Sequence, residues 1–188
     1  MSAFLLSTAV IFLAELGDKS QLMAMTFATR FRARDVLIGI TVATAIVHLL
    51  SVALGAAVGA ALPTTTISVV AGLAFLGFAG WTLRGDRLDE DEQSKAARAT
   101  SAAILAVGGA FFLAELGDKT MLATVTLATR EDWLGTWIGS TLGMVAADAL
   151  AIAVGAALGR RLPEKTIRYG AAAAFAVFGV LLLVTAAA

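Results

Sequence analysis

The octapeptide FLAELGDK at residues 12–19 occurs a second time, unchanged, at residues 112–119. Extended to residues 12–30, the first copy is identical to the chain 100 positions later at 13 of 19 positions. The same offset relates further pairs downstream, among them Gly39 and Gly139, Gly55 and Gly155, and Pro63 and Pro163. Because the offset never changes, the chain is an internal duplication with no insertion between its halves.

The composition indicates an integral membrane protein. Hydrophobic residues make up 59% of the 188 residues and charged residues only 15%, with a mean hydropathy of +0.87. Soluble domains are roughly 45–50% apolar and about a quarter charged. The formal net charge of zero argues against the basic surface of a nucleic-acid-binding protein. With no cysteine and one histidine, disulfides, thiolate nucleophiles and multi-histidine zinc or haem sites are excluded.

Six stretches are long and apolar enough to cross a bilayer, which takes about 20 mostly apolar residues. They are residues 3–29, 36–62, 65–83, 101–129, 134–159 and 166–187. We therefore predict an all-α membrane protein with six transmembrane helices. Small residues four positions apart, such as Gly55 and Gly59 or Gly155 and Gly159, are expected to form close helix contacts.

The six predicted spans divide equally between the two halves. Residues 1–83 form the first three-helix repeat, residues 84–100 an acidic cytoplasmic linker, and residues 101–188 the second repeat. An odd number of spans in each half places the second repeat upside down relative to the first. Inverted repeats are typical of secondary transporters, which hold their substrate near the middle of the membrane where the repeats meet. A purely structural duplication is the alternative.

The basic residues between the predicted spans indicate the orientation, because they gather on the cytoplasmic side. Eleven are expected on one side: Arg30, Arg32, Arg34, Arg84, Arg87, Lys95, Arg98, Arg160, Arg161, Lys165 and Arg168. Arg130 stands alone on the other side. Both termini are therefore predicted to be periplasmic. The compact size and the absence of a targeting extension favour the inner membrane of a bacterium.

The acidic residues between the halves and the tryptophans also fit a membrane protein. The predicted linker carries five acids, Asp86, Asp89, Glu90, Asp91 and Glu92. A solvated connection between the halves explains them, and a cation-sensing patch is the alternative. The tryptophans Trp81, Trp133 and Trp137 lie near span ends and are expected to anchor the helices at the membrane surface.

Charged residues lie near the middle of the first and fourth predicted spans. They are Glu15, Asp18 and Lys19 in the first, and Glu115, Asp118 and Lys119 in the fourth. Charges at this depth cost at least a few kcal/mol each unless they are paired or hydrated. Gly17 and Gly117 lie between the acids, and a glycine there permits either a helix break or the close approach of another helix.

The donor atoms of these motifs suit a divalent cation. Each motif has two acids and one lysine, so the two motifs carry a formal charge of −2 when fully ionised. Carboxylates, the hydroxyls of Ser20 and Thr120 and backbone carbonyls are hard ligands, which favour Ca²⁺, Mn²⁺ or Mg²⁺. Without the metal, crowded carboxylates in a low dielectric should bind protons. This coupling predicts a cation/proton antiporter, and the alternative is that the acids and lysines form salt bridges that hold the spans together.

Three further polar residues lie at membrane depth. His48 and Asp148 occupy equivalent positions in the second and fifth predicted spans. They are predicted to handle protons beside the metal site, together with the lysines Lys19 and Lys119. The alternative is that a buried neighbour satisfies each of them. Gln21 lies one turn after Asp18 and is a possible further ligand, although its repeat partner is Met121.

At these motifs the sequence resembles a known family. Two copies of Glu-x-Gly-Asp-Lys-Ser/Thr, here residues 15–20 and 115–120, are the signature of uncharacterised protein family sixteen, the GDT-one type cation transporters. The family includes Golgi and chloroplast manganese and calcium transporters and a bacterial manganese exporter. The resemblance covers almost the whole chain and implies cation/proton exchange. It implies that Glu15, Asp18, Glu115 and Asp118 are metal ligands, with Mn²⁺ or Ca²⁺ as substrate and no cofactor.

Other functions remain as alternatives to a divalent-cation exporter. An intramembrane enzyme is disfavoured, because no nucleophile or metalloprotease motif accompanies the acids and catalysis seldom needs them duplicated. An exporter of organic solutes would need a larger pocket lined by aromatic residues. A passive channel for divalent cations differs only in the absence of proton coupling. The lipid bilayer, a divalent metal ion and protons are thus the expected partners.

Overall fold

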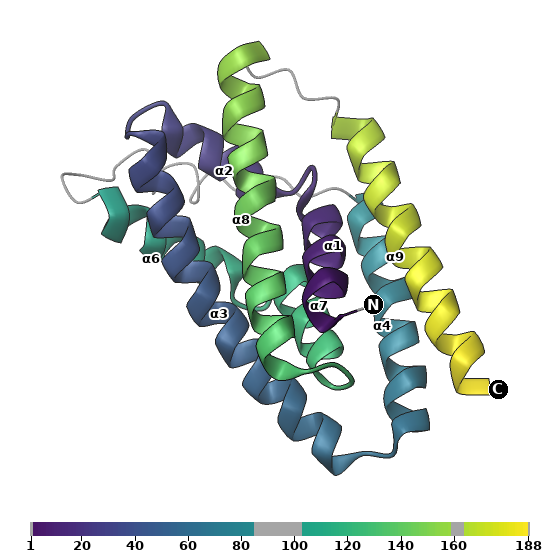
Figure 1. Cartoon of the computed structure of the whole chain (residues 1–188). Coiled ribbons are helices and arrows are strands. Elements are labelled where there is room, and N and C mark those ends of the chain that lie inside the picture. The colour runs from purple at the N-terminus through teal and green to yellow at the C-terminus, as the bar shows by residue number, and fades with distance from the viewer. Residues whose placement is uncertain (1, 85–102, 159–163, 188) are drawn as a thin grey trace.

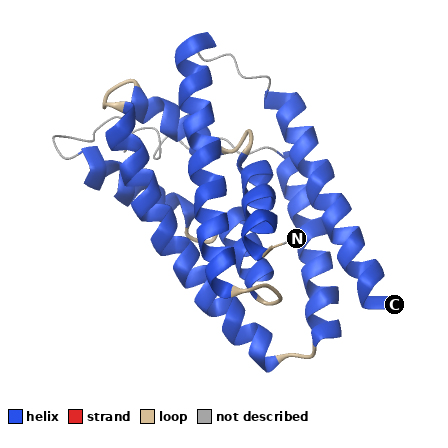
Figure 2. Ribbon diagram, viewed as in Figure 1, coloured by secondary structure: helices blue, strands red, loops and turns tan. Residues whose placement is uncertain are grey.

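The computed structural model describes residues 2–84, 103–158 and 164–187, and within these ranges it contains helices and no strands (Figures 1 and 2). The first half contains α1 (Ala3–Glu15), α2 (Lys19–Ala28), α3 (Ala33–Ala61) and α4 (Thr64–Arg84). The second half contains α6 (Ala103–Glu115), α7 (Lys119–Ala128), α8 (Trp133–Leu158) and α9 (Glu164–Ala187). The all-α prediction is confirmed for this part of the chain.

The predicted spans are recovered in two different forms. The second, third, fifth and sixth correspond to the continuous helices α3, α4, α8 and α9. Three of the described helices, α3, α4 and α8, are long and apolar enough to cross a membrane, whereas α1, α6 and the apolar part of α9, Phe175–Ala187, are shorter. The predicted linker beyond Arg84 and the predicted contact at Gly159 lie outside the described residues.

The first and fourth predicted spans are each interrupted at the charged motif. Residues 16–18 separate α1 from α2, and residues 116–118 separate α6 from α7. Gly17 and Gly117 adopt φ values of 78° and 81°, in the left-handed region that residues with a Cβ rarely occupy. Of the two possibilities that the glycines left open, the helix break is therefore the one observed at both motifs.

The broken helices of each half pack against the long helix of the other half. The α1–α2 pair lies on α8, and the α6–α7 pair lies on α3. Glycines make these contacts: an added Cβ at Gly55 would meet Val125 and Ala128, and one at Gly59 would lie 2.5 Å from the Thr129 carbonyl oxygen. The packing role predicted for Gly55 and Gly59 is thus confirmed, and it joins the two halves.

The same contacts give the relative directions of the helices. On α8, Gly139 approaches Phe4 and Gly143 approaches Thr8, so α8 runs parallel to α1. On α3, Gly39 approaches Val107 and Gly55 approaches Ala128, so α3 runs parallel to the α6–α7 pair. The remaining pair is antiparallel, because Gly72 of α4 meets Leu183 of α9 while Gly179 meets Leu76.

The glycine contacts predict opposite effects of one substitution at two positions. In Gly139→Ala the new Cβ would press on the Phe4 carbonyl oxygen, and overpacking of this kind costs about 1–3 kcal/mol. Gly77 of α4 has no atom within 4 Å of an added Cβ, so Gly77→Ala should stabilise its helix by up to about 1 kcal/mol. Thermal unfolding of the purified variants measures both, and a Gly139→Ala protein as stable as Gly77→Ala would contradict this packing.

The described residues include two buried apolar clusters. One gathers Phe27 and Ile40 with Phe111, and the other gathers Ile11 and Phe75 with Met144 and further residues of the second half. Large apolar side chains are also exposed on the outer faces of the helices, for example Leu50, Val70, Leu105 and Val184. Exposed apolar side chains on so many helices fit a multi-pass protein surrounded by lipid.

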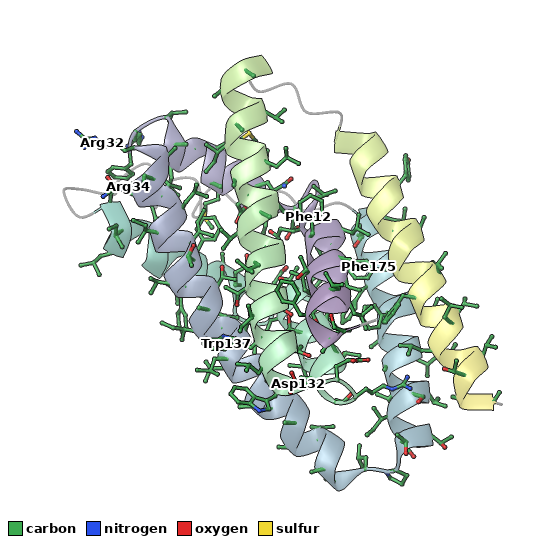
Figure 3. All side chains as sticks on the ribbon, viewed as in Figure 1. Phe12, Arg32, Arg34, Asp132, Trp137 and Phe175 are labelled. Carbon is green, nitrogen blue, oxygen red and sulfur yellow. The ribbon has the colours of Figure 1, made fainter. Side chains whose placement is uncertain are left out.

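One tryptophan differs from the expected membrane anchor. Trp133 is exposed, as an anchor should be. Trp137 is half-buried, and its indole Nε1–H donates a hydrogen bond of 2.8 Å to the carbonyl oxygen of Ala45 in α3. Trp137 therefore joins α8 to α3 (Figure 3).

Candidate functional site

The two helix breaks place the motif acids at helix ends. Glu15 is the last residue of α1 and Asp18 is the N-cap of α2; Glu115 and Asp118 take the same places at α6 and α7. In each turn the Asp N–H donates to the Glu carbonyl oxygen, at 3.1 Å in the first half and 3.2 Å in the second. Neither Asp side chain caps its own helix, although an N-cap carboxylate usually does. Both carboxylates are thus available for other contacts.

The fold buries all four motif acids together with Asp148. Glu15 and Asp148 are 0% exposed, and Asp118, the most exposed of the five, is 5% exposed. Glu15 interacts electrostatically with Glu115, Asp18 and Asp148, and Asp148 also interacts with Asp18. The structure therefore brings acids from both halves, as predicted from the duplication, into one electrostatically connected cluster.

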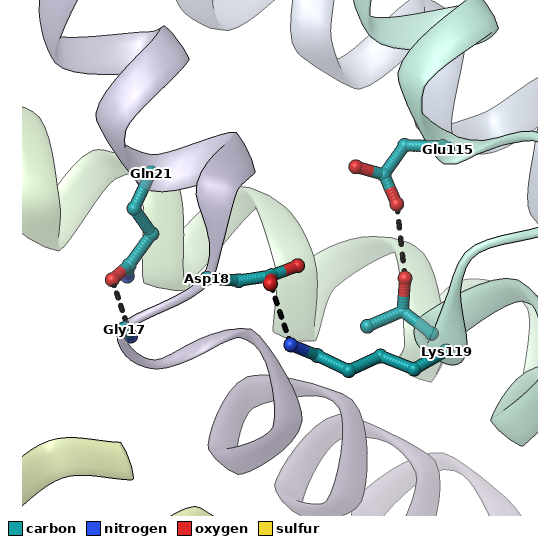
Figure 4. A network of polar contacts seen from close by, with 6 residues as sticks. Gly17, Asp18, Gln21, Glu115 and Lys119 are labelled. Atoms are coloured by element: carbon teal, nitrogen blue, oxygen red, sulfur yellow. Dashed lines mark hydrogen bonds and ion pairs between the residues drawn. The ribbon is translucent and has the colours of Figure 1, made fainter. Parts of the chain in front are cut away.

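Lys119 and Thr120 contact acids of this cluster (Figure 4). Lys119 Nζ donates to Asp18 Oδ1 at 2.5 Å, which joins the second motif to the first. Thr120 Oγ1 donates to Glu115 Oε2 at 2.9 Å within the second motif. The salt-bridge alternative therefore holds for Lys119, which is itself 2% exposed. Lys19, the equivalent residue of the first motif, is half-buried.

Other buried oxygens of the cluster make no hydrogen bond within the described part of the protein. They are both carboxylate oxygens of Glu15, both of Asp148, Oε1 of Glu115 and the hydroxyl of Ser20. Buried polar atoms are nearly always hydrogen-bonded, so such exceptions point to a proton, an ion or water. The two predicted hydroxyl ligands thus differ: Thr120 donates a hydrogen bond to Glu115, whereas the Ser20 hydroxyl has no hydrogen-bond partner within the described residues.

The acid side chains interact electrostatically, but as they stand they do not form a coordination shell for a metal ion. Among the described residues, no three of the His, Asp and Glu side chains stand in an arrangement that could hold a metal ion. The ammonium group of Lys119 instead contacts Asp18 and interacts electrostatically with Glu15. A cation bound by these carboxylates would therefore require the lysine to move.

Gln21 supports the first helix break. Its side-chain Oε1 accepts a hydrogen bond of 2.8 Å from the Gly17 N–H, and its Nε2 donates one of 2.9 Å to the Ala147 carbonyl oxygen of α8. In the second half the Gly117 N–H bonds to the sulfur of Met121 at 3.1 Å. The sequence suggested Gln21 as a ligand; the structure places its amide between the break and the helix that carries Asp148.

The repeat partners His48 and Asp148 have different surroundings. Both are buried, but only Asp148 has an electrostatic interaction with the motif acids among the contacts described. His48 Nδ1 lacks a hydrogen-bond partner within the described residues. Equivalent sequence positions therefore have different surroundings in the folded protein.

Three buried hydroxyls of α1 and α8 stand apart from the rest, and sequence reasoning did not single out two of them, those of Ser7 and Thr136. Ser7, Thr136 and Ser140 are each 0% exposed, and their hydroxyl oxygens have no hydrogen-bond partner in the described structure. In an apolar helix a hydroxyl ordinarily bonds to the carbonyl one turn earlier, as Thr141 does with Trp137. Nothing in the sequence distinguishes the first three from that ordinary case.

Comparison with known proteins gives one family and several relatives. The family model described as "Divalent cation/proton antiporter GDT1" matches residues 3–90 and 103–188. A Vibrio cholerae protein named "Putative manganese exporter" is 37% identical over 131 residues, which cover 69% of this chain and 64% of that protein. The Arabidopsis thaliana "Protein PAM71, chloroplastic" is 33% identical over 99% of this chain and 55% of its own length.

A relative of similar length is the Synechocystis "GDT1-like protein sll0615", which is 29% identical over 96% of both chains. The chain thus spans between half and two thirds of the Vibrio and Arabidopsis proteins and nearly all of the cyanobacterial one. No solved structure matches the chain.

Proposed function

The chain belongs to the GDT1 family of divalent cation/proton antiporters, and on this basis we propose that it moves Mn²⁺ or Ca²⁺ across a membrane in exchange for protons. The names of the relatives support this substrate class, because one is called a manganese exporter. By the same likeness we propose that the direction of metal movement is export from the cytoplasm, across a bacterial inner membrane. The protein is accordingly a transporter in this proposal, and no catalytic residue is assigned.

The observation that carries the proposal is the buried acid cluster. Glu15, Asp18, Glu115 and Asp118 come from both halves, and oxygens of Glu15 and Glu115 have no hydrogen-bond partner within the described protein. We assign these four acids, with the hydroxyls of Ser20 and Thr120, to the transported cation. Carboxylate and hydroxyl oxygens are ligands that Mn²⁺ and Ca²⁺ accept.

Charge explains why metal and protons should alternate. The two motifs have a formal charge of −2 when fully ionised, which one divalent cation neutralises. Carrying uncompensated charge through a low-dielectric region is costly, so protons must replace the metal on the return step. Asp148 adds a fifth carboxylate to the cluster, and we assign it to proton coupling. His48 is retained as a proton-coupling candidate with less structural support.

We further propose that the two halves form inverted three-helix repeats, with six spans in total. The helix directions support this: in an alternating six-span chain, spans one and five are parallel, as α1 and α8 are, and spans three and six are antiparallel, as α4 and α9 are. Arg32 and its repeat counterpart Asp132 also lie toward opposite ends of the bundle (Figure 3).

The inverted arrangement has a direct test in the membrane. A reporter fused at residue 92 should be cytoplasmic, and one fused after residue 188 should be periplasmic, because the basic residues gather on one side. Fusions that place residues 30–34 and 130–134 on the same side of the membrane would refute the inversion.

The proposed exchange is tested in liposomes that contain the purified protein. Mn²⁺ or Ca²⁺ movement, followed with a metal-sensitive dye, should reverse direction when the imposed pH gradient is reversed. Metal that enters the liposomes should be exchanged for protons that leave, so the internal pH should rise, and metal that leaves should lower it. Metal flux that ignores the pH gradient would leave a passive channel, and the absence of any metal flux would refute divalent-cation transport.

A further inference from the structure

A buried ion pair between Lys119 and Asp18 links the two repeats inside the proposed site. Lys119 Nζ of the second motif lies 2.5 Å from Asp18 Oδ1 of the first, and the side chains of the two residues are 3% and 0% exposed. The lysine also interacts electrostatically with Glu15. Its ammonium group therefore lies among carboxylates that the proposed function assigns to the transported cation (Figure 4).

A buried ammonium group is expensive unless carboxylates compensate it, so Lys119 depends on this position. A divalent cation at Asp18 would share this carboxylate with the lysine and would be repelled by its ammonium group at close range. Each of the two cations therefore weakens the binding of the other at Asp18. Lys119 is the first residue of α7, and the hydrogen bond from Thr120 to Glu115 ties this end of α7 to the end of α6. The lysine therefore stays within reach of the site.

We infer that Lys119 competes with the transported cation for Asp18. Its ammonium group leaves Asp18 when a divalent cation binds and returns when that cation leaves. Lys119 is thus a residue that sets the affinity of the site, in addition to joining the repeats. The inference rests on the proposed function, because it assigns the competition to the same carboxylates. It goes beyond the prediction from sequence, in which each lysine was expected only to hold one charge of its motif or to couple protons.

The experiment compares three residues at position 119 in the full-length purified protein. Mn²⁺ binding is measured by calorimetry for the wild type, Lys119→Met and Lys119→Arg, with chromatography and thermal unfolding to verify folding. Methionine removes the competing charge at similar length, so Mn²⁺ should bind about tenfold more tightly or better, within the range of coupling between close buried charges. Arginine keeps the charge and holds a carboxylate with a fork of donors, so Mn²⁺ should bind several-fold more weakly, on the order of threefold to tenfold.

Arg34 provides a matched control for the loss of one positive charge. It pairs with Asp35 at 4.0 Å, but its side chain is 87% exposed. Arg34→Met should leave the affinity for Mn²⁺ unchanged, because solvent screens exposed pairs. If Arg34→Met tightens Mn²⁺ binding as much as Lys119→Met does, the effect belongs to the net charge of the protein and the inference is wrong.

The outcomes separate this inference from the proposed function. A wild-type protein that binds neither Mn²⁺ nor Ca²⁺ contradicts the proposed function itself. A wild-type protein that binds Mn²⁺, with Lys119→Met binding it equally or more weakly, gives Lys119 a purely structural role and overturns the competition. If Lys119→Met fails to fold, Lys119→Arg decides, because it keeps the buried charge pair: weaker Mn²⁺ binding supports competition, and unchanged or tighter binding refutes it.

Discussion

Glu15→Gln should abolish metal–proton exchange while the protein still folds. Glu15 is 0% exposed and neither of its carboxylate oxygens has a hydrogen-bond partner within the described protein. Glutamine keeps the size of the side chain and one oxygen but cannot carry a negative charge or a transported proton. We expect at least about a 100-fold loss of exchange, which corresponds to about 2.7 kcal/mol. The unfolding temperature should stay the same or rise, because an unpaired buried charge costs stability.

The measurement is Mn²⁺ flux into liposomes under an imposed pH gradient, normalised to the folded protein. Glu131→Gln is the matched control, since Glu131 lies in the turn between α7 and α8, outside the acid cluster. That variant should exchange Mn²⁺ at the wild-type rate. Normal exchange by Glu15→Gln would remove Glu15 from the site. Loss of exchange together with loss of folding would mean that Glu15 has a structural role.

Asp148→Asn is expected to reduce exchange strongly, whereas His48→Gln should have a small effect. Asp148 interacts electrostatically with Asp18, Glu15 and Glu115, so its charge contributes directly to the field at the cation. Groups around the ligands of a metal typically change its affinity by about 10- to 100-fold when they are mutated. For His48 no interaction with the acids is described, so we expect a change below about threefold, less than 1 kcal/mol.

Both variants are compared at several pH values in the same liposome assay. A loss with Asp148→Asn that remains at saturating Mn²⁺ would place Asp148 in proton coupling, and a loss restored by high Mn²⁺ would place it in cation binding. Equal losses in the two variants would show that the repeat-equivalent positions act alike, contrary to the structure. The size of each effect thus tests the separation of His48 from Asp148.

Much of the site was predictable because its chemistry is local. Acids and a lysine in the middle of an apolar stretch are costly wherever they lie in the fold, so Glu15, Asp18 and their repeats stood out without coordinates. The glycine between them permitted a break, and the structure has that break at Gly17 and Gly117. The exact repeat of the motif also indicated that both halves contribute to one site. These features need only the residues and their order.

Other features could not be predicted, because they depend on contacts between halves. Identical motifs give both halves the same local backbone, so the sequence could not show that Lys119 would reach Asp18 of the other repeat. It could not separate Asp148 from His48, nor foresee that Gln21 would bind Gly17 and Ala147. Nothing in the sequence set apart the buried hydroxyls of Ser7 and Thr136.

Hydrophobicity, repetition and the cost of charge in a membrane were enough to predict an apolar helical chain, its duplication and the acids of its two motifs, with a glycine in each motif that permitted a helix break. The folded arrangement was needed to show that the helices break at both glycines, that Lys119 contacts Asp18, and what surrounds Gln21 and Asp148. The physical reason is that the two halves pack on each other: the α1–α2 pair meets α8 while the α6–α7 pair meets α3, and these long helices carry different side chains at equivalent positions. The two nearly identical motifs therefore face different long helices, α8 with Asp148 and α3 with His48.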